Sequence, residues 1–204
     1  DSSTSRGLGD VYKRQAILIP GETCWRVETA DRLAILMENE AYFDALSSAL
    51  DNARRSIVIL GWQFDPRTRL EPGTGGGDRQ AEIGHRLRML VKTRPELDVP
   101  LLIAASQGFY PHKAQRWFRK RMVEFRLDAP GPIGACHHQK VVIIDDAVAF
   151  CGGGDISVDR WDSPAHRDAD PRRCQPSGVI AAARHETMCV MSGPAALALG
   201  DLAR

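Results

Sequence analysis

Apolar residues in the first half of the chain follow the two spacings that distinguish helices from strands. Residues 41–54 and 79–92 repeat apolar side chains every three or four positions, which predicts two amphipathic helices. Residues 56–60 and 99–105 are short apolar runs with β-branched side chains, which is typical of buried strands. Each predicted helix is followed by a predicted strand, so this half of the chain alternates the two kinds of element.

The second half of the chain continues this alternation. Residues 160–178 are polar and contain prolines, so they are predicted to form a loop. Because helices and strands alternate, we expect an α/β fold with a mixed, largely parallel sheet flanked by helices. The predicted elements of this half are a basic helix over 112–120, strands over 122–127, 140–144, 147–151 and 187–191, and a helix over 194–202.

The two ends of the chain differ from the rest in their pattern. Residues 1–15 are polar, rich in serine and glycine, and without a hydrophobic period, so we interpret them as a non-native or disordered tail. Residues 16–204 are then long enough to form one lobe with its own core. Residues 201–204 still fit a helical pattern, and we expect the lobe to be truncated at its C-terminus.

The composition is that of an ordinary globular protein. Apolar residues make up 43% and charged residues 26% of the 204 positions, and the net charge of +1 does not indicate nucleic-acid binding. The five cysteines include no C-x-x-C pair, so their spacing indicates free thiols rather than a zinc site. No apolar run approaches the roughly 20 residues that span a bilayer, and we expect a cytoplasmic or membrane-peripheral location.

Two basic side chains lie at the start of the predicted strand over 140–144. Because residues two apart in a strand point to the same face, we expect His138 and Lys140 to project together. An ammonium group there can bind a phosphoryl oxygen and stabilise a charged transition state, while the imidazole attacks phosphorus or moves a proton. Asp145 ends the strand, where its carboxylate can hold the turn by hydrogen bonds to the backbone.

A glycine triplet follows the next predicted strand, over 147–151. Gly152 and Gly153 lack a Cβ atom, so a ligand phosphate can approach the backbone N–H groups closely. Asp155 comes two positions after Gly153. A histidine–lysine pair or a glycine triplet alone is weak evidence of a site, but the joint spacing of all these residues rarely arises by chance.

This joint spacing resembles the HKD signature of the phospholipase D superfamily, H-x-K-x4-D-x6-G-[GS]-x-[ND]. Residues 160–167 contain R-W-D and then H-R, a stretch that is similar to the phospholipases and transphosphatidylases of that superfamily. The resemblance covers about residues 17–204 and implies one lobe of a phospholipase D-like α-β-α sandwich. The residues that match the signature are His138, Lys140, Asp145, Gly152, Gly153 and Asp155.

The resemblance implies a two-step displacement that requires no metal and no cofactor. His138 would attack phosphorus and form a phosphohistidine, and Lys140 and Asp145 complete the catalytic motif. Residues 184–186 (R-H-E) match the W-H-D segment of the family, so Glu186 is the candidate carboxylate that orients His138. The candidate substrate-binding residues are Gly152, Gly153, Asp155 and Trp161.

The sequence contains one H-x-K-x4-D motif, whereas the resemblance implies that two histidines act together. We therefore expect the N-terminal half of an enzyme that hydrolyses or transfers the distal phosphodiester of a phospholipid, inactive on its own. The alternatives are a dimeric, single-motif endonuclease of the same superfamily and an inactive lipid-binding module. The expected partners are a phospholipid at a membrane surface and a second motif, from a missing C-terminal lobe or a homodimer partner. No nucleic acid is expected.

Overall fold

The computed structural model describes residues 17–73, 79–104, 123–128 and 136–204. The tail predicted over 1–15 and the basic helix predicted over 112–120 lie outside these residues. The other predicted helices and strands are present, with ends that differ by at most four residues from the sequence prediction. The elements are β1 (Arg32–Met37), α2 (Glu38–Asn52), β2 (Ile57–Gly61), α3 (Ile83–Thr93), β3 (Pro100–Ala104), β4 (Glu124–Asp128), β5 (Val141–Ile144), β6 (Val148–Gly152), β7 (Thr187–Ser192) and α5 (Pro194–Ala203), with short 3-10 turns at Arg79–Ala81 and Pro171–Arg173.

The strands within the described residues form one sheet in the order β1-β7-β6-β5-β2-β3-β4. Strands β2, β3 and β4 run parallel, whereas the β1–β7, β7–β6, β6–β5 and β5–β2 pairs are antiparallel. The prediction of a mixed α/β fold is confirmed, but the prediction that the sheet is largely parallel is wrong. The reason is the connection between β5 and β6, because a turn this short joins only antiparallel strands.

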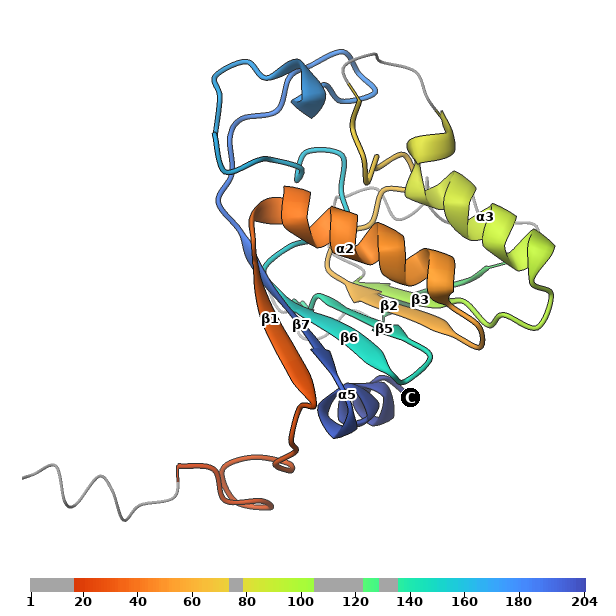
Figure 1. Ribbon diagram of the computed structural model, residues 1–204, viewed down its shortest axis with the longest axis vertical. Helices are drawn as coiled ribbons and strands as arrows, with labels where there is room; N and C mark the ends of the chain where they lie inside the picture. The colour runs from red at the N-terminus through yellow and green to blue at the C-terminus, as the bar shows by residue number, and fades with distance from the viewer. Residues whose placement is uncertain (1–16, 74–78, 105–122, 129–135) are drawn as a thin grey trace, which may run out of the picture.

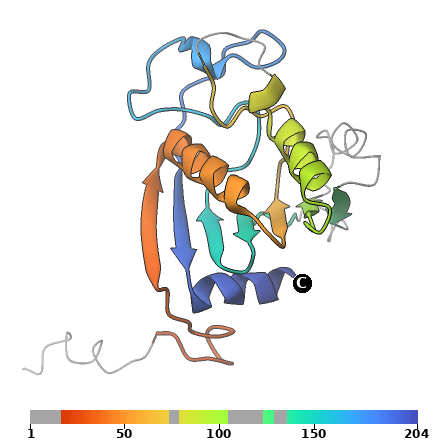
Figure 2. The same ribbon diagram turned by 45° about the vertical axis from the view of Figure 1, so that its right-hand side comes forward.

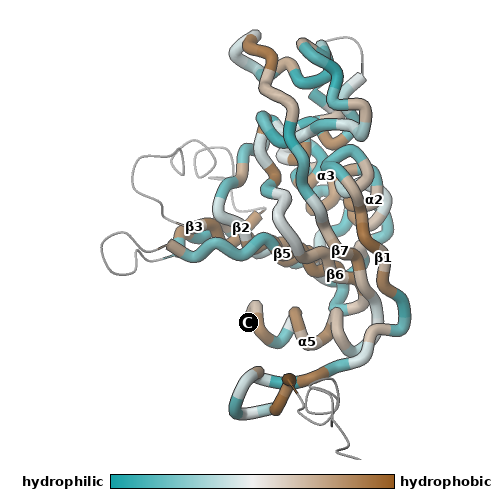
Figure 3. The backbone as a smooth tube through the Cα atoms, turned by 90° about the vertical axis from the view of Figure 1, so that its left-hand side faces the viewer, coloured by the Kyte–Doolittle hydropathy of each residue, from teal (hydrophilic) through white to brown (hydrophobic). Residues whose placement is uncertain are grey.

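The sheet lies between helices on its two faces. Figure 1 shows α2 and α3 on one face, and Figure 3 shows α5 on the opposite face. Strand β2 is buried on both faces: Ile57 and Ile59 belong to the larger core cluster under α2 and α3, and Val58 and Leu60 to the smaller one under α5. Burial on both faces explains why this strand is a continuous apolar run in the sequence.

Strand β1 is an edge strand that the hydrophobic pattern did not predict. It pairs with β7, and three of its apolar side chains, Leu33, Ile35 and Met37, are about half exposed. These alternate residues point to the face of the sheet opposite the core side chain Leu36. The strand is visible at the edge of the sheet in Figure 2.

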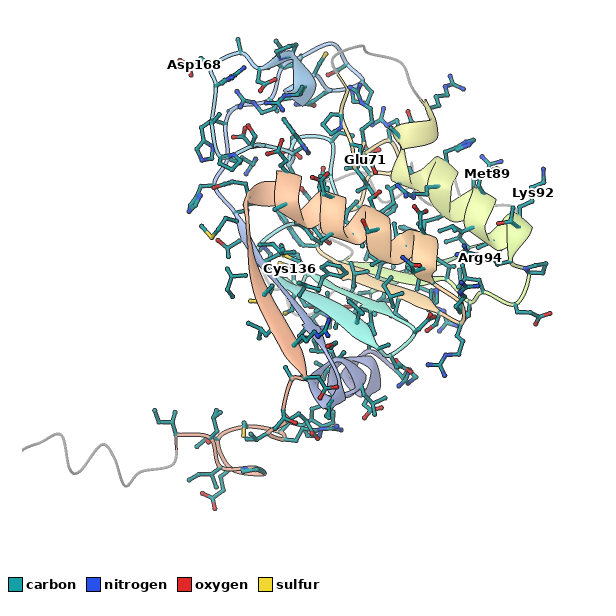
Figure 4. All side chains as sticks on the ribbon, in the orientation of Figure 1. Glu71, Met89, Lys92, Arg94, Cys136 and Asp168 are labelled. Carbon is teal, nitrogen blue, oxygen red and sulfur yellow. The ribbon has the colours of Figure 1, made fainter. Side chains whose placement is uncertain are left out.

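The two ends of the sheet carry different structures. The long segment between β6 and β7 extends beyond the end at which α2 begins, and Asp168 marks its outer part in Figure 4. Helix α5 and the C-terminus lie toward the other end of the sheet. Among the helices of the described ranges, none combines the length and the apolarity needed to cross a membrane.

Candidate active site

His138 and Lys140 lie where the chain enters β5, at the end of the sheet that carries the β6–β7 segment. The side chain of His138 is exposed, whereas Lys140 is 7% exposed. Both contact Trp62, which follows β2: the His138 ring centroid lies 5.1 Å from the Trp62 ring, and Lys140 Nζ lies 5.5 Å from it. The indole therefore brings an exposed imidazole and a buried ammonium group to one place, with the cation facing an aromatic ring.

Asp155 compensates the buried charge of Lys140. Its carboxylate Oδ2 lies 3.3 Å from Lys140 Nζ, and its Oδ1 accepts hydrogen bonds from the backbone N–H groups of Trp62 (3.1 Å) and Gln63 (3.0 Å). Asp155 is 2% exposed and ties the segment after β6 to the turn after β2, and its predicted binding of substrate stays a prediction. Lys140 Nζ also donates to the carbonyl oxygen of His138 at 3.1 Å, so among the described residues two of its three N–H donors have partners.

A small cavity lies beneath this pair and is lined by Tyr42, Gly61, Lys140, Gly154 and Asp155 among others. The Tyr42 ring is fully buried against Phe150 in the core. Burial and the negative charge of Asp155 raise the pKa of the Tyr42 phenol, so it stays protonated at neutral pH. Among the described residues that line this cavity, Lys140 and Asp155 form an ion pair.

The glycine triplet uses its N–H groups within the fold. Gly152 donates to the carbonyl oxygen of Lys140 (3.3 Å), Gly153 to that of Thr187 (3.0 Å), and Gly154 to Met188 Sδ (3.2 Å). A Cβ atom at Gly152 would lie 2.5 Å from the Thr187 oxygen, so glycine is needed for the close approach of β6 and β7. The N–H groups of Gly152 and Gly153 thus already have acceptors within the fold. Contact of these two residues with substrate stays a prediction.

Asp145 lies at the far end of β5, a four-residue strand that spans about 13 Å. Its carboxylate accepts hydrogen bonds from the backbone N–H groups of Arg54, Arg55 and Ser56 at 2.6–2.8 Å. Asp145 and Asp146 both have φ of +56°, the conformation of a two-residue hairpin turn. Partial burial acts to raise the pKa of Asp145, but the backbone N–H groups outweigh it and lower that pKa. The residue therefore anchors the turn and is separated from His138 by the length of the strand.

Glu186 precedes β7 and is held by two other side chains. Asn39 Nδ2 donates to its carboxylate at 2.5 Å, and the Arg160 guanidinium at 3.0 Å. Within the described residues, no hydrogen bond joins Glu186 to His138. The orienting role of Glu186 stays a prediction, and it requires Glu186 to exchange a present partner for the imidazole.

Trp161 lies in the β6–β7 segment and is 6% exposed. The Arg172 guanidinium lies 4.6 Å from its ring centroid, and both residues line a polar cavity together with Arg67, Thr68 and Arg69. Neither His138 nor Lys140 lines this cavity. Binding of substrate by Trp161 stays a prediction, and its observed role is to form a wall of this second cavity.

Sequence reasoning did not select Trp62, Gln63, Asn39 and Arg160 as members of the site. Arg160 donates to Gln63 Oε1 at 2.9 Å and to Glu186, and Gln63 in turn donates to Asp155. These contacts form a continuous polar path from Lys140 to Glu186. For Trp62 and Gln63 the signal in the sequence was their place directly after the buried β2 strand, where functional side chains often lie.

Comparisons with known proteins agree with this arrangement. No protein-family profile matches the sequence. Phospholipase D1 of Cricetulus griseus is 27% identical over 143 residues, which cover 64% of this chain and 13% of that protein. The chain thus spans about an eighth of the length of this relative. In the fold, Nuc from Salmonella typhimurium, described as a phospholipase D family member, has a TM-score of 0.52 at 17% identity, covering 84% of this chain and 90% of Nuc.

A second structural neighbour is phosphatidylserine synthase of Haemophilus influenzae, with a TM-score of 0.55 at 15% identity, covering 86% of this chain and 36% of that protein. The fold shared with Nuc and with this synthase is the α/β sandwich described above. Together with the sequence similarity to phospholipase D1, this shared fold makes the chain similar to proteins of the phospholipase D superfamily.

Proposed function

We propose that this chain supplies the nucleophile half of a phospholipase D-type phosphodiesterase whose substrate is a phospholipid. The observation that carries the proposal is the exposed imidazole of His138 beside the buried ammonium of Lys140. An imidazole that substrate can reach and a fixed positive charge next to it are the two groups that attack on a phosphodiester needs. The sequence similarity to phospholipase D1 supports a phospholipid over other phosphodiesters.

In the first step, an imidazole nitrogen of His138 attacks phosphorus and forms a P–N bond. The P–O bond to the headgroup alcohol breaks, and the alcohol oxygen takes a proton from an acid in the second half of the site. In the second step, water attacks phosphorus, its proton returns to that same group, and the P–N bond breaks. The products are the headgroup alcohol and a phosphatidic acid. An acceptor alcohol in place of water gives transfer instead of hydrolysis.

Lys140 contributes charge that is in place before substrate arrives. Its Nζ is already held by Asp155 and the His138 carbonyl, so little reorganisation is needed when the phosphoryl oxygens become more negative. The remaining N–H can donate to one of those oxygens. The same contact with the His138 backbone links the position of the cation to the position of the nucleophile.

The second half of the site must come from another segment or another chain, because the sequence has one H-x-K-x4-D motif. The first candidate is a second lobe of a longer protein, which fits the small share of phospholipase D1 that the chain spans. The second is a second copy of this chain. Nuc, 90% of which is covered, is of similar length, so a single lobe of this size also exists as a chain of its own, which is compatible with this alternative.

The test is phosphatidylcholine turnover, measured as choline release from vesicles, by the longer protein that carries this segment and a second motif. We expect His138→Asn to lower kcat by at least about a thousandfold, because the nucleophile is lost. The neighbouring His137→Asn is the matched control and should stay within about tenfold of the unmodified enzyme. Full turnover by the His138→Asn variant would exclude His138 as nucleophile.

A second measurement separates the two sources of the other half. The 204-residue chain alone is examined by sedimentation and for phosphodiesterase activity over a range of protein concentrations. We expect a monomer without turnover. Activity that rises with the square of the concentration, together with a dimer, would favour self-pairing and would be followed by an assay for metal-independent DNA cleavage.

A further inference from the structure

Three ligating side chains meet at a point that the proposed reaction does not use. Glu38 begins α2, His166 lies in the segment between β6 and β7, and His185 precedes β7. One potential ligand atom from each of them lies within 4.8 Å of the others. In the described residues, no hydrogen bond joins these three side chains to His138 or Lys140. Glu38 lies far from the two histidines in the sequence, and none of the sequence motifs described above includes it.

Two buried carboxylates but only one buried guanidinium surround this cluster in the described residues, so the imidazoles or another cation must compensate the second negative charge. Glu38 is 4% exposed, and Asp162, which is 1% exposed, lies directly behind His166. The buried guanidinium of Arg173 pairs with Asp162 at 2.7 Å and compensates one of the two carboxylates. The Glu38 carboxylate faces the two histidine rings and the backbone N–H of Glu186. A buried carboxylate in this position calls for a cation.

His166 is already oriented as metal-binding histidines usually are. Its Nδ1 contacts Asp162 Oδ2 at 2.9 Å, and its Nε2 faces Glu38 Oε1 at 3.4 Å. A carboxylate behind one ring nitrogen fixes the ring and leaves the other nitrogen to bind a metal. Asp162 is itself held by Arg173, by the Ser163 N–H and by the Arg184 N–H. The support for this ring is therefore rigid.

We propose that Glu38, His166 and His185 form a binding site for a divalent transition-metal ion, with Zn²⁺ as the best fit. Two imidazoles and a carboxylate are a common zinc-binding set, and tetrahedral zinc ligands lie about 3.4 Å apart. His166 Nε2 and Glu38 Oε1 have this separation. His185 Nδ1 and Glu38 Oε1 are in direct contact, so the His185 ring, which is 66% exposed, rotates outward to admit the ion. Water completes the coordination.

Glu38 Oε1 already contacts both His166 Nε2 and His185 Nδ1, and a metal ion here would replace these contacts by coordination bonds. It would tie the start of α2 to the start of β7 and to the β6–β7 segment. The Glu38 N–H donates to the Glu186 carbonyl at 2.9 Å, so the ion would also fix the backbone of the candidate orienting residue. The ion takes no part in the displacement at phosphorus, and its role is to stabilise this end of the sheet.

The experiment is calorimetric titration of the EDTA-treated, dialysed chain with ZnCl₂. We expect one equivalent of zinc to bind at this site and to raise Tm by several degrees. His185→Ala and Glu38→Gln should each weaken this binding by at least about tenfold. His85→Ala, which changes a partly exposed histidine on α3, is the matched control and should bind like the unmodified chain.

Cobalt(II) identifies the ligands independently of affinity. We expect the visible absorption of a site with nitrogen and oxygen ligands, without the intense near-ultraviolet band of a thiolate ligand. The absence of that band matters because the chain has five free cysteines that could otherwise bind the metal. The proposal is overturned if no zinc binds, if a thiolate band appears, or if folded His185→Ala and Glu38→Gln variants bind as the unmodified chain does. His185→Ala keeps the test decisive if Glu38→Gln does not fold, because the His185 side chain is largely exposed.

Discussion

The two ends of strand β5 carry two parts of one sequence motif, and they serve different purposes. At one end, Lys140 is buried against Asp155 and lies beside the exposed imidazole of His138. At the other end, Asp145 binds three backbone N–H groups in front of β2. The comparison teaches that a motif read as one catalytic unit contains a reactive end and an architectural end. Four buried residues separate the two.

The largest expected effect on stability is at the reactive end, where charge is most deeply buried. Lys140→Met leaves the Asp155 carboxylate buried without its cation, and we expect the free energy of unfolding to fall by about 3–5 kcal/mol. Urea denaturation measures it. The double variant Lys140→Met with Asp155→Asn removes both charges but keeps an oxygen for the Trp62 and Gln63 N–H groups. It should recover at least half of the loss, and an equal loss in both variants would contradict a charge effect.

At the architectural end, Asp145→Ala removes the acceptor for three backbone N–H groups. We expect the free energy of unfolding to fall by about 2 kcal/mol, because these donors lose their protein partner. Asp146→Ala is the matched control, since Asp146 has the same φ of +56° and its carboxylate pairs with the exposed Arg204. Equal losses in the two variants would assign the effect to the strained turn rather than to the carboxylate.

Acid should weaken the architectural end in a defined way. The backbone N–H groups lower the pKa of Asp145 in the folded state, so its contribution is present above its unfolded pKa of about 3.9 and is lost as the pH falls through the lower folded value. Asp145→Asn does not titrate. The difference in urea midpoint between the unmodified chain and this variant should therefore shrink below about pH 4. A difference that stays constant from neutral pH to pH 2 would refute this.

His138 has the smallest expected effect on stability, although it has the largest expected effect on turnover. The His138 side chain is exposed and packs against the ring of Trp62. His138→Asn should change the free energy of unfolding by no more than about 0.5 kcal/mol. The same urea series measures it. A loss as large as that of Asp145→Ala would mean that His138 is part of the architecture.

The buried strands could be predicted from the sequence because burial on both faces leaves a continuous apolar run, as in β2 and β5. Strand β1 could not, because Leu33, Ile35 and Met37 are exposed at an edge and its pairing depends on a strand far away in the sequence. The parallel sheet was over-predicted because alternation of elements reveals their order and not their direction.

The site was predictable where it depends on local spacing. Residues two apart at the entrance of β5 do meet at one place, around Trp62. The partners of Asp155 and Glu186 were not predictable, because they depend on which distant side chain reaches the carboxylate first. Arg160 reaches Glu186 from a loop, and Lys140 reaches Asp155 from the residue that precedes β5. The spacing of residues in the sequence does not show which of these distant side chains will pair with a given carboxylate.

The pairing of β1 with β7 has a consequence for biosynthesis. Met37 pairs with Thr187, roughly 150 residues later, and β7 separates β1 from every other strand of the sheet. At about 5–20 residues per second, a ribosome needs roughly ten to thirty seconds to make the intervening chain. During that interval the segment Arg32–Met37 has no partner strand, and Leu33 and Ile35 are available to other nascent chains or to a chaperone. Strand β1 therefore joins the sheet only after β7 has been synthesised.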